Sequence, residues 1–114
     1  MRDKLKQRES FVVANEFWMV THRLCDIFRH VLPASSDRLA SASCRIVHFI
    51  IHSDSKLHKR PGQWRIQRAL AASAAAGAAL RRMKRVPEHR IAVSAAEEVL
   101  ERLGNALRKD QTQV

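Results

Sequence analysis

The stretch from residue 64 to residue 83, WRIQRALAASAAAGAALRRM, limits most strongly what this chain can fold into. Alanine, which has the highest helix propensity, fills most of its inner positions, so the stretch should be helical. Ile66, Leu70, Ser73, Gly77 and Leu80 recur at alternating spacings of four and three and therefore share one helix face. Because that face has little bulk, it can be buried only where bulkier helices approach closely. The stretch therefore predicts the narrow inner strut of a helical bundle.

Three other segments carry apolar side chains at the same helical spacings. Proline separates the segments at positions 33, 61 and 87, since it disfavours helical dihedrals in the residue before it and suits a first helical turn. We expect Ser35 or Ser36 to cap the second helix. The apolar seams are Val13, Phe17, Val20, Leu24, Ile27 and Val31 in the first segment, Leu39, Ser43, Ile46, Ile50, Ser53 and Leu57 in the second, and Val93, Ala96, Leu100, Leu103 and Leu107 in the last.

Four helices of this length, joined by short connections, predict an all-α fold, an up-down-up-down antiparallel four-helix bundle. The bundle is expected to span residues 10–109, with a charged N-terminal arm or first turn at residues 1–9 and a polar tail at residues 110–114. A chain of 114 residues is long enough for one domain and too short for two.

The formal net charge of +10 indicates a polyanionic partner. Nucleic acid is the first candidate and an anionic membrane surface the second, while the plain alternative is that the charge only maintains solubility. The longest weakly polar run, residues 69–80, falls far short of the roughly 20 residues that a membrane span needs. Two cysteines without a secretory signal suit free thiols in a reducing compartment, so we expect a cytoplasmic protein without a membrane partner.

The basic side chains should gather at both ends of an up-down bundle, and either end can serve as a contact surface. Cations at the end of the third helix also complement the negative end of its dipole. This is a purely structural explanation for part of the basic group at that end of the bundle. Arginine and lysine contacts to phosphates give affinity without reading sequence. The predicted nucleic-acid contacts are Lys56, Lys59, Arg60, Arg65 and Arg68 at one end, and Arg81, Arg82, Lys84, Arg85 and Arg90 at the other.

Trp64 lies among the basic residues of the first end, and two roles remain open for it. A tryptophan beside arginines can stack on a nucleobase. An isolated bulky aromatic residue more commonly packs into a core or an interface.

The second helix carries an additional apolar stripe, formed by Ala40, Cys44, Val47 and Ile51. Two apolar faces on one helix of a small bundle predict that one of them contacts another subunit, so we assign these four residues to an oligomer interface. The alternative is that the bundle buries both faces itself.

Catalytic and metal-binding chemistry finds little support in the sequence. His48 and His52 are four residues apart, as are successive members of the row His22, Asp26 and His30, and such spacing can place metal ligands on one helix face. That row lies opposite the apolar seam of its helix, so solvated or interface histidines are the better explanation. The sequence has no nucleophile-elbow motif and no glycine-rich phosphate loop. We therefore predict a non-enzymatic protein without a metal or cofactor.

The last helical segment carries a resemblance to a known family. Residues 95–109, AAEEVLERLGNALRK, with their Leu103-Gly104 step, are similar to that family's last helix, and RALAAS at residues 68–73, Trp18 and the break at Pro33 also fit. On these features the chain resembles the bacterial four-helix-bundle proteins encoded in ribosomal-RNA intervening sequences and the accessory variability determinant (Avd) proteins of diversity-generating retroelements. Residues 49–54 read FIIHSD where the intervening-sequence branch has an Asn-Ile-Ala-Glu-Gly-like run, which favours the retroelement branch.

This resemblance implies a barrel-like homopentamer whose basic surface engages nucleic acid, either RNA or an RNA–DNA hybrid, and a partner reverse transcriptase. The chain would then be a non-enzymatic accessory protein that positions nucleic acid for the polymerase. The alternative is a structural oligomer or protein-interaction module of the same bundle family that does not bind nucleic acid. The salt dependence of binding separates the two, because phosphate contacts weaken steeply as salt rises.

Overall fold

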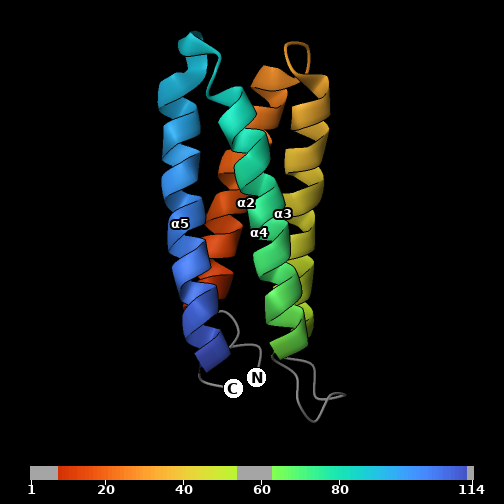
Figure 1. The fold of residues 1–114 in the computed structure, drawn as a ribbon, viewed down its shortest axis with the longest axis vertical. Coiled ribbons are helices and arrows are strands. Elements are labelled where there is room, and N and C mark those ends of the chain that lie inside the picture. Colours follow the sequence, from red (N-terminus) through yellow and green to blue (C-terminus); the bar gives the residue numbers. More distant parts are fainter. Residues whose placement is uncertain (1–7, 54–62, 113–114) are drawn as a thin grey trace.

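The computed structural model describes residues 8–53 and 63–112 and shows four long helices packed side by side (Figure 1). Each helix packs against its neighbours in the chain, and α2 also packs against α5, which closes the bundle. The predicted all-α, antiparallel four-helix bundle is therefore confirmed. Residues 1–7 of the predicted arm lie outside the described residues. The helices are α2 (Glu9–Phe28), α3 (Pro33–Ser53), α4 (Gln63–Met83) and α5 (Arg90–Thr112), with a 3₁₀ turn, η1 (Pro87–His89), before the last.

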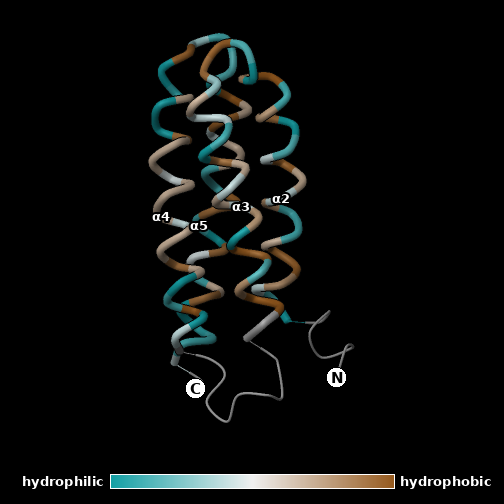
Figure 2. The backbone as a smooth tube through the Cα atoms, turned by 90° about the vertical axis from the view of Figure 1, so that its right-hand side faces the viewer, coloured by the Kyte–Doolittle hydropathy of each residue, from teal (hydrophilic) through white to brown (hydrophobic). Residues whose placement is uncertain are grey.

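One cluster of apolar side chains from all four helices forms the core. Hydrophobic and hydrophilic stretches alternate along the helices, as the changing colours of the tube show (Figure 2). Full burial of one such side chain contributes about 1.5–3 kcal/mol, so this cluster holds the bundle together. Its large, fully buried members are Phe17, Leu24 and Phe28 of α2, Leu39 and Ile46 of α3, Leu80 and Met83 of α4, and Val93, Leu103 and Leu107 of α5.

The seam predicted for the first helix is correct over most of its length and wrong at its end. Phe17 and Leu24 are buried, but Ile27 is 39% exposed and Val31 is 53% exposed, and Phe28 takes the buried position instead. An α-helix drifts by about 20° per heptad relative to a strict seven-residue repeat. The buried row therefore shifts by one residue before α2 ends at Phe28.

The third predicted helix, α4, buries the alanines of its inner face. Ala69 and Ala76 are fully buried, whereas Leu70 and Gly77, which were predicted in the seam, are only partly buried. α4 packs chiefly against α3 and α5, so it forms one corner of the bundle. The prediction of an inner strut surrounded by three helices is wrong, because α4 occupies a corner of the bundle and packs most extensively against α3.

The start of α3 differs from the predicted serine cap. α3 begins at Pro33, whose fixed φ suits the first helical position, so Ser35 and Ser36 lie inside the helix and are buried. Ser36 Oγ donates a hydrogen bond to the carbonyl oxygen of Cys25 at 3.2 Å, and Cys25 Sγ donates to the carbonyl oxygen of Ser36 at 3.3 Å. Ser36 therefore fastens α3 to α2.

Gly77 lies in the interior of α4 without a packing requirement for glycine. A Cβ added there would lie 3.6 Å from Leu100 Cδ2 and 3.8 Å from Arg81 Nη1, which is ordinary van der Waals contact. Because glycine in a helix interior costs roughly 0.5–1 kcal/mol relative to alanine, we expect Gly77→Ala to raise the free energy of unfolding by about that amount. Urea unfolding at one protein concentration measures the change.

Ala78 is the matched control for this substitution, since it is the exposed neighbour of Gly77 on the same helix. Ala78→Gly should lower the free energy of unfolding by about 1 kcal/mol. A destabilised Gly77→Ala variant beside a normally destabilised Ala78→Gly variant would contradict the space that the structure shows at Gly77.

Candidate nucleic-acid interface

The predicted basic residues fall at opposite ends of the bundle. Arg65 and Arg68 lie in the first two turns of α4, at the same end as the start of α2 and the end of α5 (Figure 1). They are separated from the second group by about 25 Å along α4, at about 1.5 Å per residue. Lys56, Lys59 and Arg60 lie outside the described residues. The second group is Arg81, Arg82, Lys84, Arg85 and Arg90, around the end of α4 and the start of α5.

The structure divides the second group between two faces of the bundle. Arg82 and Arg85 line a groove of about 550 Å³ together with the first residues of α3, among them Pro33 and Ser35. Arg81 instead lines a groove of about 390 Å³ between α4 and α5, beside Glu97 and other α5 residues. Neighbours in the sequence therefore face different surroundings, and only the groove of Arg82 and Arg85 has no acidic side chain in its lining.

Lys84 is engaged within the chain. Its Nζ lies 2.9 Å from Glu97 Oε1, so its charge is compensated by an α5 carboxylate. Arg90 is exposed at the start of α5. Of the five cations predicted at this end, Arg82 and Arg85 are the pair that the structure brings together on one acid-free groove.

Trp64 lies on the surface at the other end of α4. It precedes the buried Ile66 by two residues, or about 200° around the helix, so its ring points away from the core. The side chain is 56% exposed. The guanidinium carbons of Arg65 and Arg68 lie 5.3 Å and 5.1 Å from its ring centroid, within cation–π range, and the ring of Phe49 meets it edge-on at 6.4 Å. Within the single chain, Trp64 is therefore not a core residue.

Two arginines of α3 that are not among the predicted nucleic-acid contacts, Arg38 and Arg45, join this surface. Phe49 contacts Trp64 of α4, and Arg45 and Arg38 lie four and eleven residues before Phe49, on the same row of α3. Both are exposed. The signal was present as Arg38, Arg45 and Phe49 at spacings of seven and four, but the sequence alone does not show that this row borders α4.

Acidic residues are scarce on this side of the molecule. Asp37 is the single acidic residue in the described α3 and α4 segments. Its charge acts on Cys25 of α2, so it lies toward the opposite flank of α3. The ion pairs of the described residues include none with Arg38, Arg45, Arg82 or Arg85. These four guanidinium groups are exposed, and no carboxylate of residues 8–53 or 63–112 forms an ion pair with them.

The side of α2 and α5 is balanced by contrast. Arg102 Nη2 lies 2.7 Å from Glu16 Oε1, Arg8 Nε lies 3.3 Å from Asp110 Oδ2, and Ser10 Oγ donates a hydrogen bond to the same Asp110 oxygen at 2.6 Å. These contacts fasten the first helix to the last. Arg8 is thus matched by a carboxylate of α5, and Arg102 by a carboxylate of α2.

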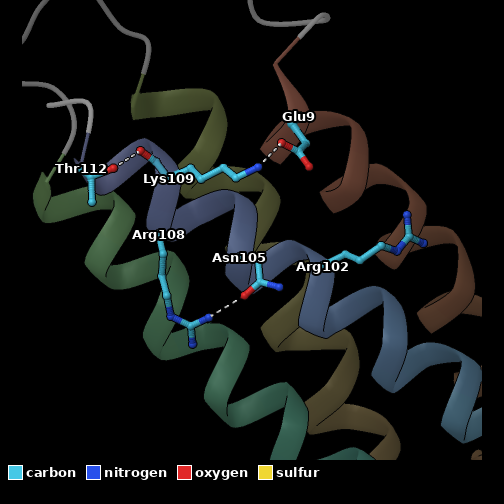
Figure 3. Close-up of a pocket in the computed structure, with 6 residues that line it drawn as sticks. All are labelled: Glu9, Arg102, Asn105, Arg108, Lys109 and Thr112. Carbon is cyan, nitrogen blue, oxygen red and sulfur yellow. Dashed lines mark hydrogen bonds and ion pairs between the residues drawn. The ribbon is translucent and has the colours of Figure 1, made fainter.

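A groove of about 550 Å³ lies on this balanced side, and Figure 3 shows the residues that line it. Lys109 Nζ reaches toward Glu9 Oε2 at 3.7 Å, and Arg108 Nη1 donates a hydrogen bond to Asn105 Oδ1 at 3.3 Å. Thr112 Oγ1 donates to the carbonyl oxygen of Lys109 at 2.8 Å. Because its cations have partners within the chain, this groove is a poorer phosphate site than the surface of α3 and α4.

The predicted oligomer stripe lies on the other flank of α3, toward α2. Ala40 and Cys44 are exposed, Ile51 is 44% exposed, and Val47 is partly buried against the core. In the single chain the bundle therefore does not cover this stripe, and Val47 alone among the four has a role in the bundle itself.

The remaining reactive groups do not assemble into a catalytic or metal centre in the described part of the chain. No group of three or more His, Cys, Asp or Glu residues there is placed to hold a metal ion. Burial raises the pKa of the Cys25 thiol, and the nearby charges of Asp26 and Asp37 act in the same direction. A raised pKa lowers the thiolate fraction and therefore the reactivity of Cys25 near neutral pH.

The described helices include none that is both long enough and apolar enough to cross a bilayer. Comparison of the chain with protein-family models, curated proteins and solved structures found no match.

Proposed function

We propose that this chain is a basic, non-enzymatic, oligomeric accessory protein that binds nucleic acid, either RNA or an RNA–DNA hybrid. The observation that supports this most is the separation of charge between the two sides of the bundle. Among the described residues, Arg38, Arg45, Arg82 and Arg85 of the α3 and α4 side form no ion pair, whereas Arg8, Arg102 and Lys109 on the other side each contact a carboxylate of the opposite helix. A one-sided positive surface on a chain of net charge +10 is suited to phosphates.

The identity of the partner enzyme rests on the sequence resemblance to the accessory variability determinant family. This resemblance implies a homopentamer that acts in the cytoplasm with the reverse transcriptase of a diversity-generating retroelement. The structure adds the uncovered stripe Ala40, Cys44 and Ile51 as the candidate contact between subunits. A structural oligomer of the same fold that does not bind nucleic acid is the competing function.

The mass of the purified chain by light scattering, with and without a structured RNA at low and high salt, tests the proposal. We expect a stable assembly near five times the 13.0 kDa chain mass that takes up RNA at low salt and releases it at high salt. An intact oligomer that ignores RNA at low salt would establish the structural alternative. A monomer that ignores RNA would contradict both the oligomer and the nucleic-acid function.

The oligomer interface has its own test at Ile51. Placing Asp there should dissociate the assembly, because a carboxylate would be buried against an apolar partner surface without a cation to pair with it. Light scattering at several concentrations measures the mass. Ile51 is the better target than Val47, since Val47 also packs on the core.

The matched control is Ile91→Asp, because Ile91 is 88% exposed and lies on α5, away from the stripe. This variant should keep the mass of the unmodified protein. Equal masses for the Ile51→Asp and Ile91→Asp variants would mean that the α3 stripe is not the subunit contact.

A further inference from the structure

One surface of the bundle extends along α4 from one basic group to the other, and α4 places no acidic residue on it. We call it the α3–α4 face and define it by Arg38 and Arg45 of α3 and by Trp64, Arg68, Ala75 and Arg82 of α4. We propose that this face holds a single strand of nucleic acid that runs along α4, with one unpaired base stacked at Trp64. This inference rests on the proposed nucleic-acid function and names the form of the ligand and its path.

The α4 members of the face share one row of the helix. Trp64, Arg68, Ala75 and Arg82 follow at spacings of four, seven and seven, so their side chains leave α4 in nearly the same direction. All four are exposed. From Trp64 to Arg82 the row covers about 27 Å at about 1.5 Å per residue, which matches roughly eight stacked nucleotides at about 3.4 Å each.

The middle of the row is smooth and uncharged. Ala71, Ala75 and Ala78 are exposed there, and their methyl groups leave space for a strand to lie close to the helix. α4 contains no acidic residue to repel a phosphate, and Arg45 of the neighbouring helix borders this part of the face. Positive charge therefore flanks the path at both ends and along its α3 side.

The Trp64 end offers a stacking surface, and this surface should make the protein prefer a single strand to a duplex. Bases stack on indole rings and on guanidinium planes. The Trp64 side chain is 56% exposed, and the guanidinium groups of Arg65 and Arg68 lie over its ring, so a base would stack there by replacing one of these two groups. A base within a duplex is already stacked and paired, so it cannot use such a surface. The opposite end, with Arg82 and Arg85 on their groove, contacts phosphates only.

The first test places one negative charge on the path. Ala75→Glu should lower the affinity for an oligouridine of about twelve nucleotides by roughly 10-fold at low salt, because a carboxylate in mid-path repels the backbone. Ala95→Glu is the matched control, since it makes the same substitution at an exposed helical position of α5. It should change affinity much less, although it lowers the net charge by the same unit. Equal losses in the two variants would overturn the path along α4.

The second test removes the stacking ring without changing charge. Trp64→Leu should weaken oligouridine binding by about 10-fold, the usual effect of losing one base–aromatic stack, while Trp64→Phe should retain most of it. The slope of affinity against salt should stay the same, because no phosphate contact is lost. Binding of an RNA hairpin of equal length should be unaffected. An unchanged affinity for oligouridine in the Trp64→Leu variant would overturn the stacking role.

Fluorescence supplies a direct signal for the contact. The chain has two tryptophans, so Trp18→Phe leaves Trp64 as the single reporter, and stacking of a base should quench its emission. If the unmodified protein binds neither oligouridine nor hairpin, the proposed function itself fails. If it binds both equally, and neither quenching nor the Ala75→Glu effect appears, the proposed function stands and this inference fails.

Discussion

Replacing Arg82 and Arg85 together by Glu should lower the affinity of the protein for RNA by on the order of 100-fold at low salt. Both side chains line the acid-free groove at the start of α3, and neither forms an ion pair within the described residues. Each reversal removes one phosphate contact and adds a repulsive charge. The slope of log affinity against log salt should fall by about two, one unit for each lost contact. Fluorescence anisotropy across a salt series measures both quantities.

Arg81 provides the sharpest control for this experiment, because it is the direct neighbour of Arg82 on another face. Its side chain lines the α4–α5 groove beside Glu97 and Glu101. Arg81→Glu should therefore leave the salt slope nearly unchanged. If Arg81→Glu weakens binding as much per residue as the double reversal, then net charge controls binding and the α3–α4 side is not the contact surface. Unchanged thermal unfolding of the variants shows that the fold is intact.

Replacing Phe17 by Ala should lower the free energy of unfolding by about 3–5 kcal/mol, the largest effect that we expect on stability. Phe17 is fully buried in the centre of α2, within the cluster to which all four helices contribute. Its removal loses the transfer free energy of the ring and leaves a cavity that the surrounding helices fill only in part. For a domain whose total stability is typically about 5–15 kcal/mol, this change brings the protein close to unfolding. Urea unfolding followed by circular dichroism measures it.

Met19 is the matched control on the same helix, since it is 57% exposed two residues away. Met19→Ala should change the free energy of unfolding by no more than about 0.5 kcal/mol. Comparable losses in both variants would mean that the outer face of α2 is also covered, as it would be in a subunit contact that the single chain does not show.

The fold could be predicted from the sequence because its apolar residues recur at helical spacings and prolines interrupt them. The burial of a few individual residues could not be predicted from the sequence. The exchange of Ile27 for Phe28 in the core follows from the drift of a helix against a heptad repeat, which depends on where packing begins. To predict which alanines of α4 are buried, one must know which helices pack against it, because alanine is compatible with both the buried and the exposed face of a helix.

The candidate site was predictable in its residue types and less so in its grouping. Charge content and position along the helices predict Arg82 and Arg85 as contact residues. That Arg81 and Arg82 line different grooves depends on which helix lies on each side of α4, and the sequence does not show this. Arg45 was missed for the same reason, since it is isolated in the sequence and meets the other arginines only in the bundle. The compensation of Lys84 by Glu97 joins two helices and likewise has no local signal.

The contact between Arg8 and Asp110 brings the first and last described segments together at one end of the bundle. Both residues lie at the same end, 3.3 Å apart, so the first and last helices present their outer termini side by side. A domain, tag or surface linked at either terminus is therefore attached beside the end at which α4 begins. The groove of Arg82 and Arg85 lies at the opposite end of the bundle, so we expect it to stay accessible when either terminus carries the link.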